Sequence, residues 1–455
     1  MCLLLNVAET MAAAKSERPN VLFIAVDDLN DWISVLGGHP QGATPNIDRL
    51  VKRGVLFRNA HCAAPACNPS RTALMTGLHP SSTGVYLNSN PWRPVLPDVV
   101  TLPQHFTAHG YRVGGSGKIY HGGYEDPASW QHYLNKGGDP KPTPAVANDP
   151  HSKAGGIIWG RLDGVADEEM NDYKMVSYAL DELKKEHDKP FFLACGIYRP
   201  HMPWQVPGKY YNMFPISDIQ LPEHRADDLK DIPPAGLKMG KPKGDHATIT
   251  RTDNWKHAVQ AYLASMAFTD AMLGRLLDGF DESAYRDNTI IVFWTDHGWH
   301  LGEKEHWRKF SLWEEATRVP MAMIVPGLTR AGQVCDRPVG LIDIYPTLIE
   351  LCGLKPKPEL FGRSLAPLLK RPGAEWPYPT LTTHGRLNHA LRDDRYRFIR
   401  YANGDQELYD HQSDPMEYTN LAATEAGRKV ISRLSEWLPK TDVPEAPSES
   451  KGRKS

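Results

Sequence analysis

Four continuous apolar runs are separated by helical patterns between residues 18 and 375. The runs begin at Val21, Phe191, Thr289 and Met321. Runs without polar alternation are typical of central strands that are covered on both faces. Apolar residues also recur at helical spacing over 259–280, which predicts one long helix there. Strands that alternate with helices predict an α/β fold with a large, mostly parallel sheet flanked by helices.

Two long segments interrupt this alternation. Residues 122–165 are rich in Gly, Pro, Asn and Asp, and residues 205–255 are polar and contain Pro-Pro and Gly-Lys-Pro-Lys-Gly. Loops of this length in a compact domain are usually functional or mobile. We expect both segments to lie over the same side of the sheet as the active site.

The character of the chain changes after residue 375. Short strand-like pieces at 396–401 and 407–409 precede a helical stretch at 425–438. The pattern therefore predicts a main domain over 18–375 and a small C-terminal α+β subdomain with a short antiparallel sheet over 376–440. Residues 1–17 and 441–455 have the composition of a disordered leader and a disordered tail.

Composition narrows the class of protein. Among 455 residues, 52 basic side chains nearly balance 54 acidic ones, so no overall field favours nucleic acid. No stretch approaches the roughly 18–20 apolar residues of a membrane span. Six cysteines are too few for a disulfide framework in a chain of this length. The leader lacks the basic start and long apolar core of a clear signal peptide.

Reactive side chains follow three of the four apolar runs. The first run ends in Asp27 and Asp28, the second leads to His201, and the third ends in Asp296 and His297. Each residue alone is more often a helix cap, a turn residue or a surface residue. The carboxyl ends of parallel strands meet at one edge of a sheet, so the coincidence of three favours a shared site.

The adjacent carboxylates Asp27 and Asp28 need a positive partner. Successive strand residues face opposite sides, so both can aim at one point only where the strand has broken into a turn. A hard divalent cation, with Asp296 and His297 completing its ligands, accounts for the pair. Oxygen-rich ligation favours Ca²⁺ or Mg²⁺, and the single imidazole leaves the choice of metal open.

The most specific stretch of the chain starts at residue 67. It reads Cys67-Asn68-Pro69-Ser70-Arg71 and continues to Gly77. Pro69 suits the first turn of a helix, which places Cys67 at a helix N-terminus, where backbone N–H groups favour anions. Spacing alone is equally compatible with a small buried cysteine beside a capped helix.

This stretch resembles the signature of type I sulfatases, in which the cysteine is converted to formylglycine (3-oxoalanine). Further segments resemble the family in its own order: 26–29, 44–50, 117–121, 295–298, 343–348 and 407–410. The likeness covers roughly residues 18 to 425. Within the family it favours the iduronate-2-sulfatase-like branch, because Pro200-His201-Met202-Pro203 and His297 match that branch.

The resemblance implies an alkaline-phosphatase-like fold and a set of residue roles. It implies a metal site formed by Asp27, Asp28, Cys67, Asp296 and His297. Formylglycine at position 67 would hydrate to a diol, attack sulfur with help from Arg71 and carry a covalent sulfate. His201 would protonate the leaving alcohol and His121 would act as the base. Lys118 and Lys309 would hold the sulfate oxygens. Without the resemblance, Lys118 would more often be a surface lysine and His121 a turn residue.

Four further residues are candidates for binding the substrate. Trp299 and His300 follow the second metal segment and could form a wall of the site, although a Trp near a strand end is as often core packing. Trp92 and Arg93 could recognise a sugar carboxylate or sulfate.

The resemblance implies a sulfuric ester hydrolase that acts on a sulfated carbohydrate, such as a 2-sulfated uronate or a related polysaccharide unit. Its partners would be the sulfated saccharide and a formylglycine-generating enzyme, and its substrate class implies export. One alternative is a phosphonate or phosphodiester hydrolase of the same superfamily. Another is an inactive carbohydrate-binding relative, which the intact Cys67, Arg71, Lys118 and His121 argue against.

Overall fold

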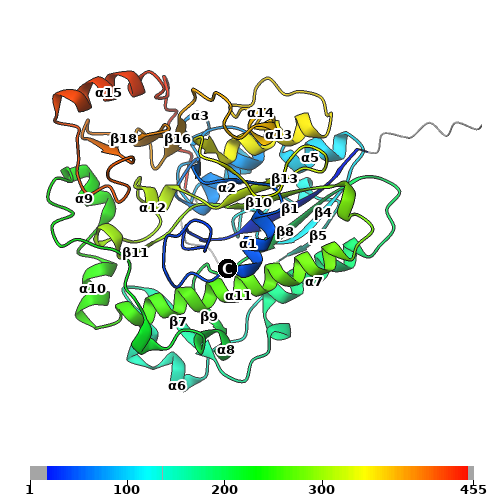
Figure 1. Cartoon of the computed structure of the whole chain (residues 1–455), viewed down its shortest axis with the longest axis horizontal. Coiled ribbons are helices and arrows are strands. Elements are labelled where there is room, and N and C mark those ends of the chain that lie inside the picture. Colours follow the sequence, from blue (N-terminus) through cyan, green and yellow to red (C-terminus); the bar gives the residue numbers. More distant parts are fainter. Residues whose placement is uncertain (1–17, 136, 449–455) are drawn as a thin grey trace, which may run out of the picture.

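The computed structural model describes residues 18–135 and 137–448, so the expected leader lies outside the described residues. Its centre is an eight-stranded sheet (Figure 1). In spatial order the strands are β14 (Gln333–Cys335), β2 (Val55–Phe57), β13 (Met321–Ile324), β10 (Thr289–Thr295), β1 (Asn20–Val26), β8 (Phe191–Ile197), β4 (Arg112–Gly117) and β5 (His132–Asn135). All four apolar runs of the sequence are strands of this sheet.

The sheet is mostly parallel, which confirms the predicted fold class. Strand β13 is the exception, because it pairs antiparallel with both β10 and β2. Strands β1, β8 and β10 run parallel to one another and end at the same edge. The carboxyl end of β13 points away from that edge, which explains why the fourth apolar run carries no reactive side chain at its end.

Helices cover both faces of the sheet (Figure 1). One face packs against α1 (Pro45–Val51), α7 (Asn171–Leu183) and α11 (Trp255–Asp281), and the other against α2 (Cys67–Thr76), α5 (Leu102–Ala108), α13 (Ile344–Leu351) and α14 (Ala366–Lys370). In β1, Leu22 and Ile24 join the first core while Phe23 and Ala25 join the second. A strand buried on both faces has no solvent-facing position, hence its uninterrupted apolar run.

Helix α11 contains the predicted helix over 259–280 and extends it at both ends. Its buried residues include Val259, Leu263, Leu273 and Leu277. Within the described part of the chain, no helix has the length and apolar character that a membrane crossing requires.

The two polar segments contain short elements rather than irregular loops alone. The first carries α6 (Pro144–Ala147), β6 (Lys153–Ala154) and β7 (Ile157–Leu162), and β7 pairs with β9 (Trp204–Pro207). The second carries α8 (Gly208–Tyr211), α9 (Pro234–Gly240) and α10 (Asp245–Arg251). These elements are too short to show a clear hydrophobic period, so the sequence pattern does not reveal them.

The short connections around the main sheet also contain regular structure. They comprise α3 (Pro80–Thr83), α4 (Trp92–Val95), α12 (Glu314–Thr317), the pair β3 (Ala60–His61) with β15 (Val339–Gly340), and the pair β11 (His300–Leu301) with β12 (Trp307–Arg308).

The C-terminal part is a four-stranded antiparallel sheet with one helix. It consists of β16 (Thr380–Thr383), β17 (His389–Arg392), β18 (Tyr396–Arg400), β19 (Gln406–Asp410) and α15 (Glu425–Ser435). The sequence predicts disorder from residue 441, but residues 442–446 lie along residues 81–84. The Val443 N–H donates to the Ser81 carbonyl at 3.0 Å, and the Ala446 N–H donates to the Gly84 carbonyl at 2.9 Å. The composition of residues 441–455 does not reveal that the carbonyls of Ser81 and Gly84 can accept hydrogen bonds from this segment.

Candidate active site

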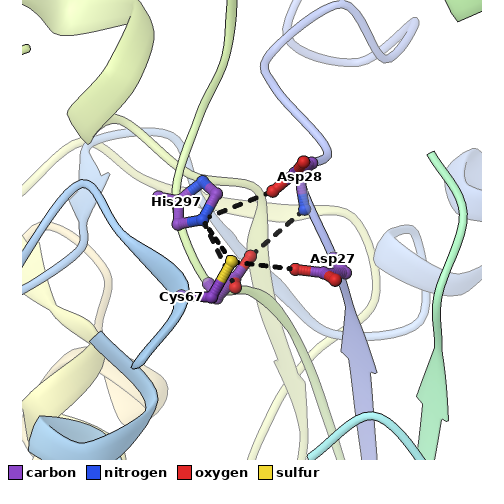
Figure 2. Close-up of side chains that lie close together, drawn as sticks. Asp27, Asp28, Cys67 and His297 are labelled. Atoms are coloured by element: carbon purple, nitrogen blue, oxygen red, sulfur yellow. Dashed lines mark hydrogen bonds and ion pairs between the residues drawn. The ribbon is translucent and has the colours of Figure 1, made fainter. Parts of the chain in front are cut away.

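The residues predicted to bind a metal meet at the edge where β1 and β10 end. Asp27 and Asp28 follow β1, Asp296 and His297 follow β10, and Cys67 is the first residue of α2. One ligand atom from each of these five buried residues lies within 4.8 Å of the others. Figure 2 shows Asp27 and Asp28 pointing from the end of β1 toward Cys67 and His297.

A left-handed backbone at Asp28 makes this convergence possible. Its φ is 60°, a region that few non-glycine residues occupy and that Asp tolerates better than most. The strand has therefore turned before Asp28, so consecutive carboxylates reach the same point. The Asp28 N–H donates to Asp296 Oδ1 at 3.2 Å, which ties the two metal segments together.

Cys67 lies in a ring of positive groups. Its Sγ is 3.0 Å from Lys309 Nζ, 3.4 Å from His297 Nε2 and 3.8 Å from Lys118 Nζ. Burial by itself would raise the pKa of the Cys67 thiol, but Lys118, Lys309 and His297 lower it well below its ordinary value. The position thus favours a negatively charged group, as a helix N-terminus also does.

Arg71 lies one turn into α2 and is fully buried. Its Nε donates to Asp296 Oδ2 at 2.9 Å, its Nη2 to Asp27 Oδ1 at 3.2 Å and its Nη1 to the Lys118 carbonyl at 2.6 Å. Burial raises the pKa of Asp296 to about 7 even though Arg71 opposes the shift. Arg71 therefore links the helix, both metal segments and the end of β4.

Lys118 and Lys309 neutralise the carboxylates of the first metal segment. Lys118 forms an ion pair with Asp27, and Lys309 Nζ lies 2.6 Å from Asp28 Oδ1. Burial would raise the pKa of Asp27, but Lys118 holds it well below its usual range. Lys118 leaves β4 at Gly117, where φ is 79° and a Cβ would lie 1.9 Å from the neighbouring backbone oxygen of Gly196.

The residues present fit a bound divalent cation. Asp28 Oδ2 is buried and has no hydrogen-bond partner, and such an orphaned oxygen in an interior calls for an explanation. Three carboxylates and one imidazole form a donor set that suits a hard cation such as Ca²⁺ or Mg²⁺.

Two histidines lie on the open side of this cluster. His201 follows β8, its Nδ1 lies 2.6 Å from the Met202 carbonyl oxygen, and its Nε2 lies 3.9 Å from Asp28 Oδ2. A carbonyl contact at Nδ1 requires the proton there, so Nε2 is the nitrogen that faces the site. His121 is partly buried, and its Nδ1 has no hydrogen-bond partner.

A pocket of about 520 Å³ opens beside Lys118, His121 and His201. The segment over 122–135 forms much of its wall, as expected for the first polar segment. Sequence reasoning did not identify three aromatic residues of this wall, Trp130, Tyr133 and Tyr198. The position of Tyr198, three residues before His201, was the available signal for it, and its ring centre lies 5.2 Å from Lys118 Nζ.

The four predicted substrate-binding residues lie around the site without lining this pocket. Trp299 is 1% exposed, and its ring centre is 5.2 Å from Lys309 Nζ. His300 is fully buried and contacts Ser311 Oγ at 2.9 Å. Trp92 is buried against the Tyr120 ring, and Arg93 forms an ion pair with Asp126 at 2.6 Å. These contacts support neighbouring segments, and a role of the four in binding substrate stays a prediction.

Known proteins resemble this chain over most of its length. The sulfatase family model matches residues 19–354, and a model described as N-sulphoglucosamine sulphohydrolase, C-terminal, matches residues 302–443. A protein named sulfatase from Formosa agariphila is 41% identical in an alignment of 451 positions that covers 94% of this chain and 87% of that protein. Human iduronate 2-sulfatase is 29% identical over 402 residues, covering 77% and 72% of the two chains.

A solved structure shares the fold. The phosphonate monoester hydrolase of Agrobacterium radiobacter superposes with a TM-score of 0.75 at 24% identity, covering 92% of this chain and 94% of that one. At that identity the likeness concerns the fold alone. The sulfatase model covers more than two thirds of the chain, and the 41% identical relative extends over nearly all of it. The chain therefore belongs to the sulfatase family and is a sulfuric ester hydrolase.

Proposed function

We propose that this enzyme removes sulfate from a sulfated carbohydrate, a 2-sulfated uronate or a related polysaccharide unit, by means of formylglycine made from Cys67. The observation that carries the proposal is the setting of Cys67 Sγ, 3.0–3.8 Å from Lys309, His297 and Lys118 at the start of a helix. Similarity to human iduronate 2-sulfatase supports the uronate.

Two groups would complete the site. Asp27, Asp28, Asp296, His297 and residue 67 would hold a Ca²⁺ or Mg²⁺ ion, which would supply Lewis-acid polarisation of the sulfate group. Formylglycine at position 67 would supply a hydrated aldehyde, whose two hydroxyls provide a nucleophile for sulfur and a route for release of the sulfate. A plain cysteine has a thiol in place of these two hydroxyls, so we infer that a formylglycine-generating enzyme is a partner.

Lys118 and Lys309 would bind the sulfate. Both ammonium groups face Cys67 while they pair with Asp27 and Asp28. With a divalent cation neutralising those carboxylates, the two lysines would be free to donate hydrogen bonds to the sulfate oxygens. Donors that are fixed in a buried site stabilise the charge that develops during transfer. Arg71 keeps Lys118 in place by donating a hydrogen bond to the backbone carbonyl of Lys118.

The two histidines would move the protons. His201 Nε2 faces the pocket and protonates the oxygen of the leaving sugar. His121, whose side chain interacts with that of Cys67, takes a proton from the side chain at position 67. Both residues line the pocket in which the sugar would bind, so each can reach the reacting group from the solvent side.

The aromatic wall would receive the sugar ring. Trp130, Tyr133 and Tyr198 line the same pocket, and the faces of sugar rings pack well on aromatic side chains. Sulfated polysaccharides occur outside cells, so we propose that the enzyme is exported.

The test is sulfate release from defined sulfated saccharides, including a 2-sulfated uronate disaccharide, with peptide mass reporting the state of residue 67. We expect the 2-sulfated uronate to be the preferred saccharide and Cys67→Ala to be inactive. Activity of Cys67→Ala would refute the role of residue 67. If the protein released no sulfate from any saccharide although residue 67 was fully converted to formylglycine, it would be an inactive carbohydrate-binding relative.

A second candidate is a phosphonate or phosphodiester hydrolase, because the fold matches a phosphonate monoester hydrolase. Paired aryl sulfate and aryl phosphodiester substrates separate the two activities. A higher kcat/KM for the phosphodiester would favour this candidate over the proposed removal of sulfate from a carbohydrate.

A further inference from the structure

Residues 442–446, called here the C-terminal strap, lie along residues 81–84 of the main domain. Backbone hydrogen bonds join the strap to Ser81 and Gly84, and the Tyr86 hydroxyl donates to the Val443 carbonyl at 2.9 Å. Ala446 is 6% exposed, although its neighbours in sequence are open to solvent. The strap is therefore bound through both backbone and side-chain contacts.

Asn90 connects the strap to a tight turn at residues 87–90. Its Nδ2 donates to the Ala446 carbonyl at 2.8 Å. Its Oδ1 accepts from the Leu87 N–H at 2.7 Å and from the Tyr86 N–H at 3.1 Å. Asn90 is fully buried, so loss of the strap would leave its amide group without the Ala446 acceptor in the interior.

The same turn holds the start of the helix that carries Cys67. The Asn68 Nδ2 donates to the Asn90 carbonyl at 2.7 Å and to the Leu87 carbonyl at 3.1 Å. In return, Asn88 Oδ1 accepts from the Asn68 N–H at 2.9 Å. Asn68 is adjacent to Cys67, so a shift of the turn would move the residue that carries out the reaction.

The turn also borders the segment that carries His121. The Tyr124 hydroxyl donates to the Ser89 carbonyl at 3.1 Å, and the Tyr124 N–H donates to the His121 carbonyl at 2.9 Å. The rings of His121 and Tyr124 lie 6.0 Å apart. The turn at residues 87–90 therefore contacts both the start of α2, which carries Cys67, and the segment that carries His121.

We propose that the C-terminal strap positions the active site, with Asn90 as the positioning residue that transmits its contact to Asn68 and to the segment of His121. The strap holds the 87–90 turn, and the turn fixes the distance between residue 67 and His121. None of these groups is placed against the substrate. Because displacement of a reacting group by about 1 Å can cost about 100-fold in rate, we expect the strap to act on kcat.

The direct test compares chains that end at Thr441 and at Ser448, each normalised to the converted fraction of residue 67. We expect the chain ending at Thr441 to lose about tenfold or more in kcat with KM changed by less than about twofold. A synthetic peptide of residues 440–448 should restore kcat. Unchanged kcat, or loss that the peptide does not restore, would overturn the proposal.

Two glycines provide a matched pair of point variants. Gly84 and Gly110 have φ of 78° and 84°. A Cβ at Gly84 would lie 2.5 Å from the Pro444 carbonyl oxygen, whereas a Cβ at Gly110 has no heavy atom within 4 Å. Both Ala substitutions share the backbone strain, and only Gly84→Ala pushes against the strap. We expect a lower kcat for Gly84→Ala alone, and equal kcat values would count against the strap.

The kinetic tests rest on the proposed function, so amide hydrogen exchange supplies an independent measure. We expect residues 68, 87 and 124 to exchange faster in the chain ending at Thr441 than in the chain ending at Ser448. Equal exchange would exclude the strap's positioning role whatever the substrate. Faster exchange in an enzyme without activity on sulfate esters would instead overturn the proposed function and support the strap.

Discussion

At the scale of the residue, a single backbone torsion shapes the metal site. Asp28 has φ of 60° directly after β1, and this turn brings its carboxylate beside that of Asp27. The two adjacent aspartates in sequence already required a break in the strand, because strand residues alternate between faces. The torsion that provides the break could not be predicted from the aspartates alone.

Replacing Asp28 by Asn tests its charge while keeping a residue that tolerates a left-handed backbone. We expect Asp28→Asn to lower affinity for a divalent cation by at least about tenfold, because ligand charge sets affinity for hard cations. Isothermal titration of the chelator-treated protein measures this. Asp253→Asn is the control, since Asp253 has φ of 54° but is exposed. Equal affinity of the two variants would contradict the assignment.

Asp172 supports the segment that carries His201. Its two carboxylate oxygens accept from the Tyr198 and Arg199 N–H groups at 2.8 and 2.9 Å. Burial raises the pKa of Asp172 from 3.8 to about 6, against the opposing effect of Arg199. A raised pKa means that the folded state prefers the protonated acid. The contribution of Asp172 to the free energy of unfolding is therefore complete below pH 3.8 and is lost as the pH rises toward 6.

The shift predicts a pH-dependent difference between the enzyme and Asp172→Asn. A shift of about two pKa units corresponds to about 3 kcal/mol, so the free energy of unfolding of the variant relative to the wild type should rise by about that amount from pH 4 to pH 6.5. Urea titrations at both pH values measure it. The same substitution at the exposed Asp98 is the control for the loss of one carboxylate.

Sequence reasoning at this scale predicted which residues lie together where they follow a strand or begin a helix. Asp27, Asp28, Cys67, Asp296 and His297 were each placed by such a boundary, and the structure brings them together. Exposure has no comparable signature in a sequence. Trp299 and Trp92 are nearly fully buried, and neither the identity of a tryptophan nor its neighbours reveals which way the ring points.

At the scale of the element, the segment around Lys309 is held by contacts from outside the main sheet. Arg308 has φ of 74°, its Nε lies 2.6 Å from Asp245 Oδ2, and its Nη2 donates to the Gly155 carbonyl at 3.0 Å. Asp245 belongs to the second polar segment and Gly155 to the first. Both long segments therefore anchor the stretch that carries a sulfate-binding candidate.

Arg308→Gly removes these anchors without adding backbone strain, because glycine accepts a positive φ. We expect kcat/KM for the sulfate ester to fall about tenfold through displacement of Lys309. Folding should be retained, since a partly exposed ion pair contributes about 1 kcal/mol or less. Arg225→Gly removes the exposed pair with Asp227 and is the matched control. A similar kcat/KM for both variants would show that the anchors do not matter.

Four strands of the main sheet, β1, β8, β10 and β13, could be predicted from their apolar runs, but the direction of β13 could not. A run of buried residues reads the same whichever way the strand points, and direction depends on the connections before and after it. The short elements of 122–165 and 205–255 were missed for a different reason. They gain their order from packing against the main domain rather than from local periodicity.

At the scale of the whole molecule, the metal site should contribute to the stability of the fold. The carboxylates of Asp27, Asp28 and Asp296 come from two strands that are far apart in sequence, and all three are buried. A cation that binds only the folded chain adds about 2.7 kcal/mol when its concentration is 100 times Kd.

Chelation should therefore lower the Tm of the enzyme, and added Ca²⁺ or Mg²⁺ should restore it. Differential scanning calorimetry measures both steps, and the ion that restores Tm at the lower concentration is the preferred one. Asp296→Asn should show a smaller response because one charged ligand is gone. A Tm that does not change on chelation and metal addition would argue against a cation bridging the two strands.

Burial of Cys67 has a consequence for the timing of protein synthesis. Its side chain is fully enclosed, and Lys309, which contacts its sulfur, lies 242 residues further along the chain. A ribosome adds roughly 5–20 residues per second, so Cys67 precedes Lys309 by roughly 10–50 s. The proposed conversion to formylglycine has to take place while the chain is still open, so translation speed and folding rate together set the fraction of enzyme molecules that become active.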